Sequence, residues 1–90
     1  MLVLPVELTH EHAAACCRML ELGLRNDPES SVVADAGPLE RFDSSALSVL
    51  LDCRREALAL GKTFSVKGMP SRLRVLAGLY GVAELLPAAP

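Results

Sequence analysis

Apolar and polar positions alternate along this chain in short blocks, and each block predicts one element. Residues 2–8 predict a strand that Pro5 interrupts, because proline has no N–H to donate to a ladder and so suits an edge or a bulge. Over residues 11–24 apolar side chains recur every three or four positions, which predicts a helix capped by Thr9. The mostly apolar run 31–36 predicts a strand buried in the centre of a sheet.

A second helix is predicted to begin at Asp43 or Ser44, because Asp and Ser accept hydrogen bonds from the free N–H groups of a first helical turn. It runs to about Leu60 and ends at Gly61. Its core face is expected to hold Ala46, Leu47, Leu50, Leu51, Ala57 and Leu58, and its opposite face Ser48, Asp52, Arg55 and Glu56.

The last third of the chain continues the same order of strand and helix. Residues 63–67 alternate between polar and apolar, as a half-buried strand does. The helix that follows is capped by Ser71 and ends at Gly81. Its inward side chains are expected to be Leu73, Leu76 and Leu79. Residues 82–86 add one more turn.

Strands and helices thus alternate without a linker or a repeat. Parallel neighbours can be joined only by crossover connections, so this order predicts an α/β fold with a small mixed, mainly parallel sheet of about four strands and helices mainly on one side. Ninety residues fit a single domain, residues 1–90, with one modest core. Only Phe42, Phe64 and Tyr80 are aromatic, so we expect an aliphatic core that needs neither metal nor disulfide.

Charge and hydropathy argue against two classes of partner. A formal net charge of -2 disfavours nucleic-acid binding, which needs a clustered excess of Lys and Arg. The sequence has no transmembrane segment, so direct membrane insertion is not expected. The N-terminus lacks the basic flank and the small-residue cleavage site of a secretion signal, and we therefore expect a cytoplasmic protein.

Histidines and cysteines offer one candidate metal site. His12 and Cys16 are four residues apart on a predicted helix, with His10 nearby, but no fourth ligand of suitable spacing follows. Cys16, Cys17 and Cys53 cannot all pair, and adjacent cysteines are poor partners for each other. We expect no metal or other cofactor, and reduced thiols that behave as small apolar side chains.

Polar side chains gather where a site is expected in such a sheet, beyond the carboxyl ends of its strands, in the loop 37–42 and the helix start. Ser44 or Ser45 as a nucleophile would need a base and an oxyanion site, but no Gly-x-Ser-x-Gly turn is present. Asp35 and Asp43 give weak support for magnesium and better suit loop hydrogen bonds and capping. Without a glycine-rich phosphate loop, we expect neither an enzyme nor a nucleotide-binding protein.

Two segments together resemble the signature of the STAS domain family. In that signature an apolar strand ends near an Asp, as in residues 33–36, and leads to Asp-Ser/Thr-Ser/Thr/Gly-Gly-Leu, as in residues 43–47. The likeness covers roughly residues 30–87, although Ala46 replaces the family's Gly and the N-terminal third is short. The C-terminal pattern is most similar to the small STAS subunit of the bacterial phospholipid ABC transporter that maintains outer-membrane lipid asymmetry.

The resemblance implies a non-catalytic cytoplasmic subunit, peripheral to the inner membrane, that binds the ATPase subunit of an ABC transporter with a membrane permease. Ser44 matches the family position that lies at this ATPase contact and that is phosphorylated in anti-sigma-factor antagonists. The alternative implied function is therefore an antagonist that sequesters an anti-sigma kinase and is switched by phosphorylation of Ser44. Ala46 and the C-terminal pattern favour the transporter subunit.

Both functions would use the same surface. The N-terminal end of the second helix favours a negative group, whether a phosphate on Ser44 or Ser45 or a partner's carboxylate, because its N–H groups and helix dipole are positive there. We expect the partner to cover this end. The expected contact residues are Arg41, Asp43, Ser44, Ser45, Ser48, Asp52, Arg55, Arg72 and Arg74.

Overall fold

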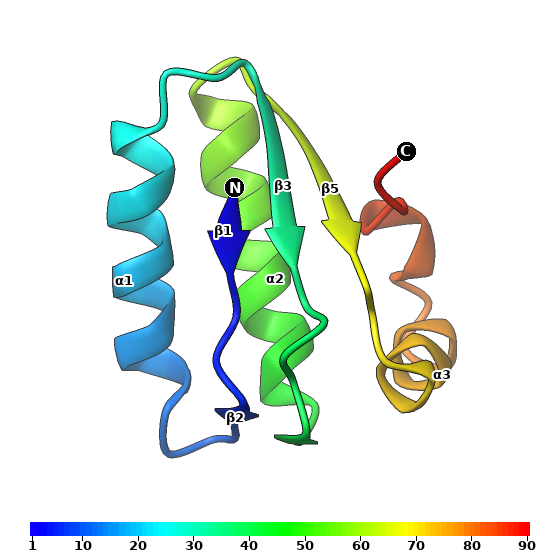
Figure 1. The fold of residues 1–90 in the computed structure, drawn as a ribbon. Helices are drawn as coiled ribbons and strands as arrows, with labels where there is room; N and C mark the ends of the chain where they lie inside the picture. Colours follow the sequence, from blue (N-terminus) through cyan, green and yellow to red (C-terminus); the bar gives the residue numbers. More distant parts are fainter.

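The computed structural model describes all of residues 1–90, and its strands form two small sheets in which every pair is parallel (Figure 1). The larger sheet has the strand order β1 (Leu2–Val3), β3 (Ser31–Asp35), β5 (Thr63–Lys67). The smaller sheet pairs β2 (Glu7–Leu8) with β4 (Arg41–Phe42). The expected α/β fold with a mainly parallel sheet is confirmed, but its strands are divided between two sheets and none is antiparallel.

Pro5 lies where the N-terminal segment changes from one sheet to the other. Before it, the N–H of Leu4 donates to the carbonyl oxygen of Asp35, beside β1, at 2.9 Å. After it, the carbonyl oxygen of Val6 accepts a hydrogen bond from the N–H of Glu40, just before β4, at 2.8 Å. The chain therefore changes partner at the residue that has no N–H for a ladder, and the interruption expected at Pro5 is confirmed.

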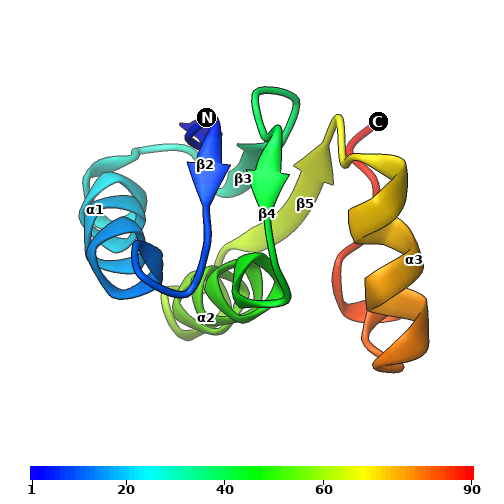
Figure 2. The ribbon, with the colours of Figure 1, turned by 90° about the horizontal axis from the view of Figure 1, so that it is seen from below.

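The helices lie mainly on one side of the strands, as expected. They are α1 (Ala13–Asn26), α2 (Ser45–Ala59) and α3 (Ser71–Leu79), followed by a 3₁₀ turn, η1 (Ala83–Leu85). Helices α1 and α2 run side by side against one face of the strands, whereas α3 stands beyond β5 (Figure 1, Figure 2). The additional turn expected near the C-terminus is η1.

The C-terminal segment covers the outer edge of β5. The N–H of Val66 donates to the carbonyl oxygen of Pro87 at 2.8 Å, and the N–H of Ala89 donates to that of Val66 at 2.9 Å. Ala88 thus lies parallel to Val66 in the manner of a further strand. The edge of the larger sheet next to α3 is therefore already occupied by the chain itself.

The core consists of 21 buried residues, all of them apolar. The larger sheet contributes alternate residues, because successive side chains of a strand point to opposite faces: Leu2, Val32, Ala34, Phe64 and Val66. Helices α1 and α2 cover them with Cys16, Leu20, Leu24, Ala46, Leu47, Val49, Leu50, Cys53 and Ala57. Phe64 is the one aromatic side chain in this set, so the expected aliphatic core is confirmed.

The expected caps of the first and last helices are wrong. Helix α1 begins at Ala13 rather than Glu11, because a separate turn precedes it in which the N–H of His12 donates to the carbonyl oxygen of Thr9 at 3.0 Å. The Thr9 hydroxyl lies 3.1 Å from Nδ1 of the His12 ring and caps nothing. In α3 the chain enters through Pro70, so Ser71 is already helical and its side chain makes no capping bond.

Two leucines expected in the core are instead exposed, Leu58 by 49 % and Leu79 by 77 %. Each residue of a helix is rotated by about 100° from the one before it. In α2 the core position is Ala57, so Leu58 points away from it. In α3 the buried residues are Leu73 and Ala77, so Leu79, two positions beyond Ala77, faces outward.

Candidate functional site

The start of α2 is held by the carboxylate of Asp43. Its Oδ1 accepts a hydrogen bond from the N–H of Ser45 at 2.8 Å, and its Oδ2 accepts one from the N–H of His10 at 3.0 Å. These two donors, that of Ser45 first, lower the pKa of the Asp43 carboxyl. Asp43 thus caps α2 and ties it to the loop before α1, which confirms the expectation that the helix start is capped at this position.

Ser44 makes no such bond. It lies at the N-cap position with a helical backbone, and its exposed side chain has no capping hydrogen bond. Because Asp43 already serves the N–H of Ser45, the Ser44 hydroxyl is left facing solvent at the positive end of the helix. It is therefore available to a partner or to a phosphate. Ser45 is half-buried beside it.

A shallow groove begins at Ser44 and runs between α2 and the end of α3. Its volume is about 240 Å³. The lining comes from both helices and the turn that follows α3: Ser44, Leu47, Ser48, Leu51, Tyr80 and Val82. Figure 2 shows the two helices that form its walls, α2 beneath the strands and α3 beside them. The fold thus places Tyr80 in the lining of the same groove as Ser44, which the sequence pattern did not indicate.

Arg72, an expected contact residue, lies in the first turn of α3. Its guanidinium carbon is 4.9 Å from the centre of the Phe42 ring, a cation–π contact that joins the first turn of α3 to β4. Phe42 immediately precedes Asp43, so Arg72 is placed near the start of α2. Arg41 lies apart, 82 % exposed and 4.0 Å from the Glu7 carboxylate across the smaller sheet.

Of the expected contact residues farther along α2, Asp52 lies at the seam with α1, whereas the Arg55 side chain is 82 % exposed. Asp52 faces the thiol of Cys17, with Oδ2 3.8 Å from Sγ, and it also lies 3.6 Å from the guanidinium of Arg55. Burial, followed by the Glu21 carboxylate, raises the pKa of the Cys17 thiol to about 12. Ser48 lines the Ser44 groove, so the polar face of α2 runs from that groove toward α1.

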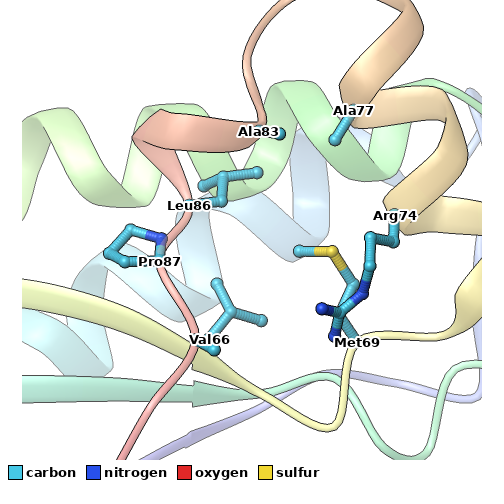
Figure 3. A pocket seen from close by; sticks show the side chains of 8 residues that line it. Val66, Met69, Arg74, Ala77, Ala83, Leu86 and Pro87 are labelled. Carbon is cyan, nitrogen blue, oxygen red and sulfur yellow. The ribbon is translucent and has the colours of Figure 1, made fainter.

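Arg74 lies in a different place from Arg72. It borders a cavity of about 260 Å³ between α3, β5 and the C-terminal segment, together with Val66, Met69, Ala77, Ala83, Leu86, Pro87 and Ala88. Figure 3 shows Arg74 reaching down beside Met69, with Val66 and Leu86 across the cavity. Because two positions along a helix are about 200° apart, the two arginines serve opposite sides of α3.

The residues considered for catalysis or metal binding make contacts close to their own positions in the chain or remain free. Oδ1 of Asp35 accepts a hydrogen bond from the N–H of Gly37 at 2.9 Å, within its own loop, as expected for a loop carboxylate. No group of three or more His, Cys, Asp or Glu side chains is arranged to hold a metal ion. His12 contacts Thr9 and lies 3.8 Å from the Glu7 carboxylate. The three cysteines are free thiols.

Comparison with known proteins agrees with this geometry. The family model described as "Mlab, STAS domain" matches residues 1–87, which includes the short N-terminal third as well as the motif around Ser44. No curated protein matches the chain. None of its helices has both the length and the apolar character needed to cross a membrane. Since the match covers nearly the whole chain, this protein belongs to the STAS domain family, within which it is of the MlaB type.

Proposed function

We propose that this STAS-domain protein is a non-catalytic subunit that binds the ATPase subunit of a phospholipid-transport ABC complex on the cytoplasmic side of the membrane. The observation that carries the proposal is the free Ser44 hydroxyl at the start of α2, bordered by the α2–α3 groove. The MlaB-type family match supports the choice of the ATPase subunit as partner. It also supports a complex that contains a membrane permease and maintains outer-membrane lipid asymmetry.

The surroundings of Ser44 favour docking over catalysis. A nucleophilic serine needs a base within hydrogen-bond reach and a set of oxyanion donors. The Ser44 hydroxyl makes no hydrogen bond to a base, and the N–H of Ser45 is engaged by Asp43. The thiols of Cys17 and Cys53 have pKa values raised by burial to about 12, which disfavours the reactive thiolate. STAS domains in general are non-catalytic.

The test is co-purification with the ATPase subunit of a phospholipid-transport ABC complex from the same organism, followed by titration calorimetry. Ser44→Arg should retain the fold, because the side chain is exposed. It should weaken binding by about 2 kcal/mol, roughly 30-fold in Kd, since a bulky cation would then sit at a helix N-terminus within the contact. Ser44→Ala should lose about 1 kcal/mol or less.

Ser30→Arg is the matched control, since Ser30 is also exposed but lies at the opposite end of the strands, just before β3 (Figure 1). It should bind as the wild type does. Wild-type affinity for Ser44→Arg would place the contact elsewhere on the domain, and failure of the wild type to bind the ATPase at micromolar concentration would contradict the proposed function.

The same hydroxyl supports a second candidate, an anti-sigma-factor antagonist switched by phosphate on Ser44. Its exposure and the positive helix end both suit a phosphoserine. Mass spectrometry of the protein from cells distinguishes the two, because the switch needs reversible phosphate on Ser44 whereas the transporter subunit needs only a constant docking face. A neighbouring gene for a kinase and a sigma factor would favour the antagonist.

A further inference from the structure

The cavity between α3, β5 and the C-terminal segment is lined by one charged side chain and otherwise by apolar ones. Its volume is about 260 Å³. Its inner lining includes Val66, Ala77 and Leu86, which are 2 %, 1 % and 5 % exposed. Protein interiors are packed with few voids larger than a water molecule, so a hollow of this size beside the core is a candidate ligand site.

Arg74 supplies the only charge in this lining and lies at its exposed rim. Figure 3 shows its side chain descending from α3 beside Met69, on the side of the cavity across from Leu86. The ion pairs of the structure all use other cations, so no carboxylate of the chain neutralises Arg74. A guanidinium is always ionised and donates several hydrogen bonds in one plane, and this one is therefore free to bind an anion.

The rest of the lining favours an alkyl chain over a peptide or a sugar. The N–H of Val66 donates to the carbonyl oxygen of Pro87, and its carbonyl oxygen accepts from the N–H of Ala89. An extended peptide thus finds these backbone groups of β5 already paired. No hydroxyl or amide side chain lines the cavity to recognise a sugar.

The volume and the single charge limit the ligand further. An apolar cavity of about 150 Å³ takes benzene, so about 260 Å³ has room for roughly ten non-hydrogen atoms, as in a carboxylate of about eight carbons. One guanidinium matches the single charge and the two coplanar oxygens of a carboxylate. It would leave part of the charge of a phosphate monoester without a partner.

We infer that this cavity binds a medium-chain alkyl carboxylate, with the alkyl chain against Val66, Ala77 and Leu86 and the carboxylate on Arg74. The site is separate from the groove at Ser44, to which Arg74 does not contribute. It adds a small-molecule ligand to a domain whose proposed partner is a protein, and neither depends on the other.

The test is a titration of the isotope-labelled protein with sodium octanoate, followed through amide chemical shifts in NMR spectra. Octanoate should cause saturable shifts at Val66, Ala77, Ala83 and Leu86 at millimolar concentration or below. Acetate has the carboxylate without the chain, and 1-octanol has the chain without the carboxylate. Each should bind about tenfold more weakly than octanoate.

Two matched pairs of variants locate the ligand. Arg74→Gln should weaken octanoate binding about tenfold and leave 1-octanol binding unchanged, whereas Arg72→Gln removes an equal charge outside the cavity and should have no effect. Ala83→Phe introduces a ring at an exposed position of η1 that lines the cavity, and it should prevent binding of both ligands. Its control is Ala14→Phe, at an exposed position of α1.

Circular dichroism melts check that each variant folds, and Ala83→Leu replaces Ala83→Phe if the latter does not. Wild-type octanoate affinity in Arg74→Gln or in the folded Ala83 variant would overturn the inference. So would the absence of saturable shifts in the wild type. Shifts that gather at the exposed side chains Val75 and Leu79 would overturn it as well, because they would show adsorption to the surface of α3 instead of binding in the cavity.

Discussion

Replacing Leu73 with alanine tests how α3 is attached to the domain. Helix α3 stands beyond β5 and contributes only Leu73 and Ala77 to the core. The Leu73 side chain is fully buried, so Leu73→Ala removes apolar contacts and leaves a cavity that the neighbours fill only in part. We expect a loss of about 3 kcal/mol in the free energy of unfolding.

This loss is large for a domain of ninety residues, whose total stability is of the order of 5–13 kcal/mol. It should lower the Tm by roughly 15 °C. Urea titration followed by far-ultraviolet circular dichroism measures it directly, through a lower midpoint with an unchanged slope. A lower slope would instead indicate that α3 has detached in the native state.

Leu79→Ala is the matched control, with the same residue type on the same helix. Because Leu79 is 77 % exposed, its truncation should change stability by less than about 0.5 kcal/mol. Equal losses for Leu73→Ala and Leu79→Ala would mean that α3 packs through both faces, and they would refute the orientation of α3.

The remaining predictions concern a turn and the thiols. Gly68→Ala should destabilise the domain by about 1–2 kcal/mol, because Gly68 has φ +66° and a Cβ there would lie 3.1 Å from the backbone nitrogen of Gly37. Gly78→Ala, in open space on α3, should be neutral or stabilise by up to about 1 kcal/mol, and melts that rank the two in the opposite order would contradict this geometry. Cys17 and Cys53, with pKa values raised by burial to about 12, should react with iodoacetamide slowly until urea is added. Since folding keeps these thiols protonated, their contribution to stability is present below their ordinary pKa of 9.0 and declines above it. An increase of the urea midpoint as the pH is raised above 9.0 would therefore count against their burial.

Local patterns were sufficient to predict β3, β5 and the first two helices, but not β4, which lies in the segment 37–42 that was expected to be a loop. The alternation in residues 63–67 and the apolar run before Gly37 predict β5 and β3, because a strand with one covered face shows its period directly in the sequence. Pro5 predicts the break between β1 and β2 for the equally local reason that it has no N–H. The division of the strands into two sheets depends on which strand each half of that segment meets, which no local pattern encodes.

The orientation of α3 could not be predicted in the same way. This helix has only nine residues and carries apolar side chains on both faces, so the spacing of Leu73, Leu76 and Leu79 is no better than that of Val75 and Tyr80. Its position beyond β5 decides which face is buried.

Asp43 and Ser44 have different roles at the start of α2, although the sequence pattern allowed either of them to cap the helix. Asp43 binds the N–H groups of Ser45 and His10 and thereby fixes the helix start, while Ser44 contributes no cap. Substitution of a capping serine normally costs about 1 kcal/mol of stability, which would confuse any binding measurement. Here Ser44 variants should keep wild-type stability, so that a change in their affinity reports on the contact itself. Asp43→Ala should instead lower the stability of the domain, since it releases both the helix start and the loop that precedes α1.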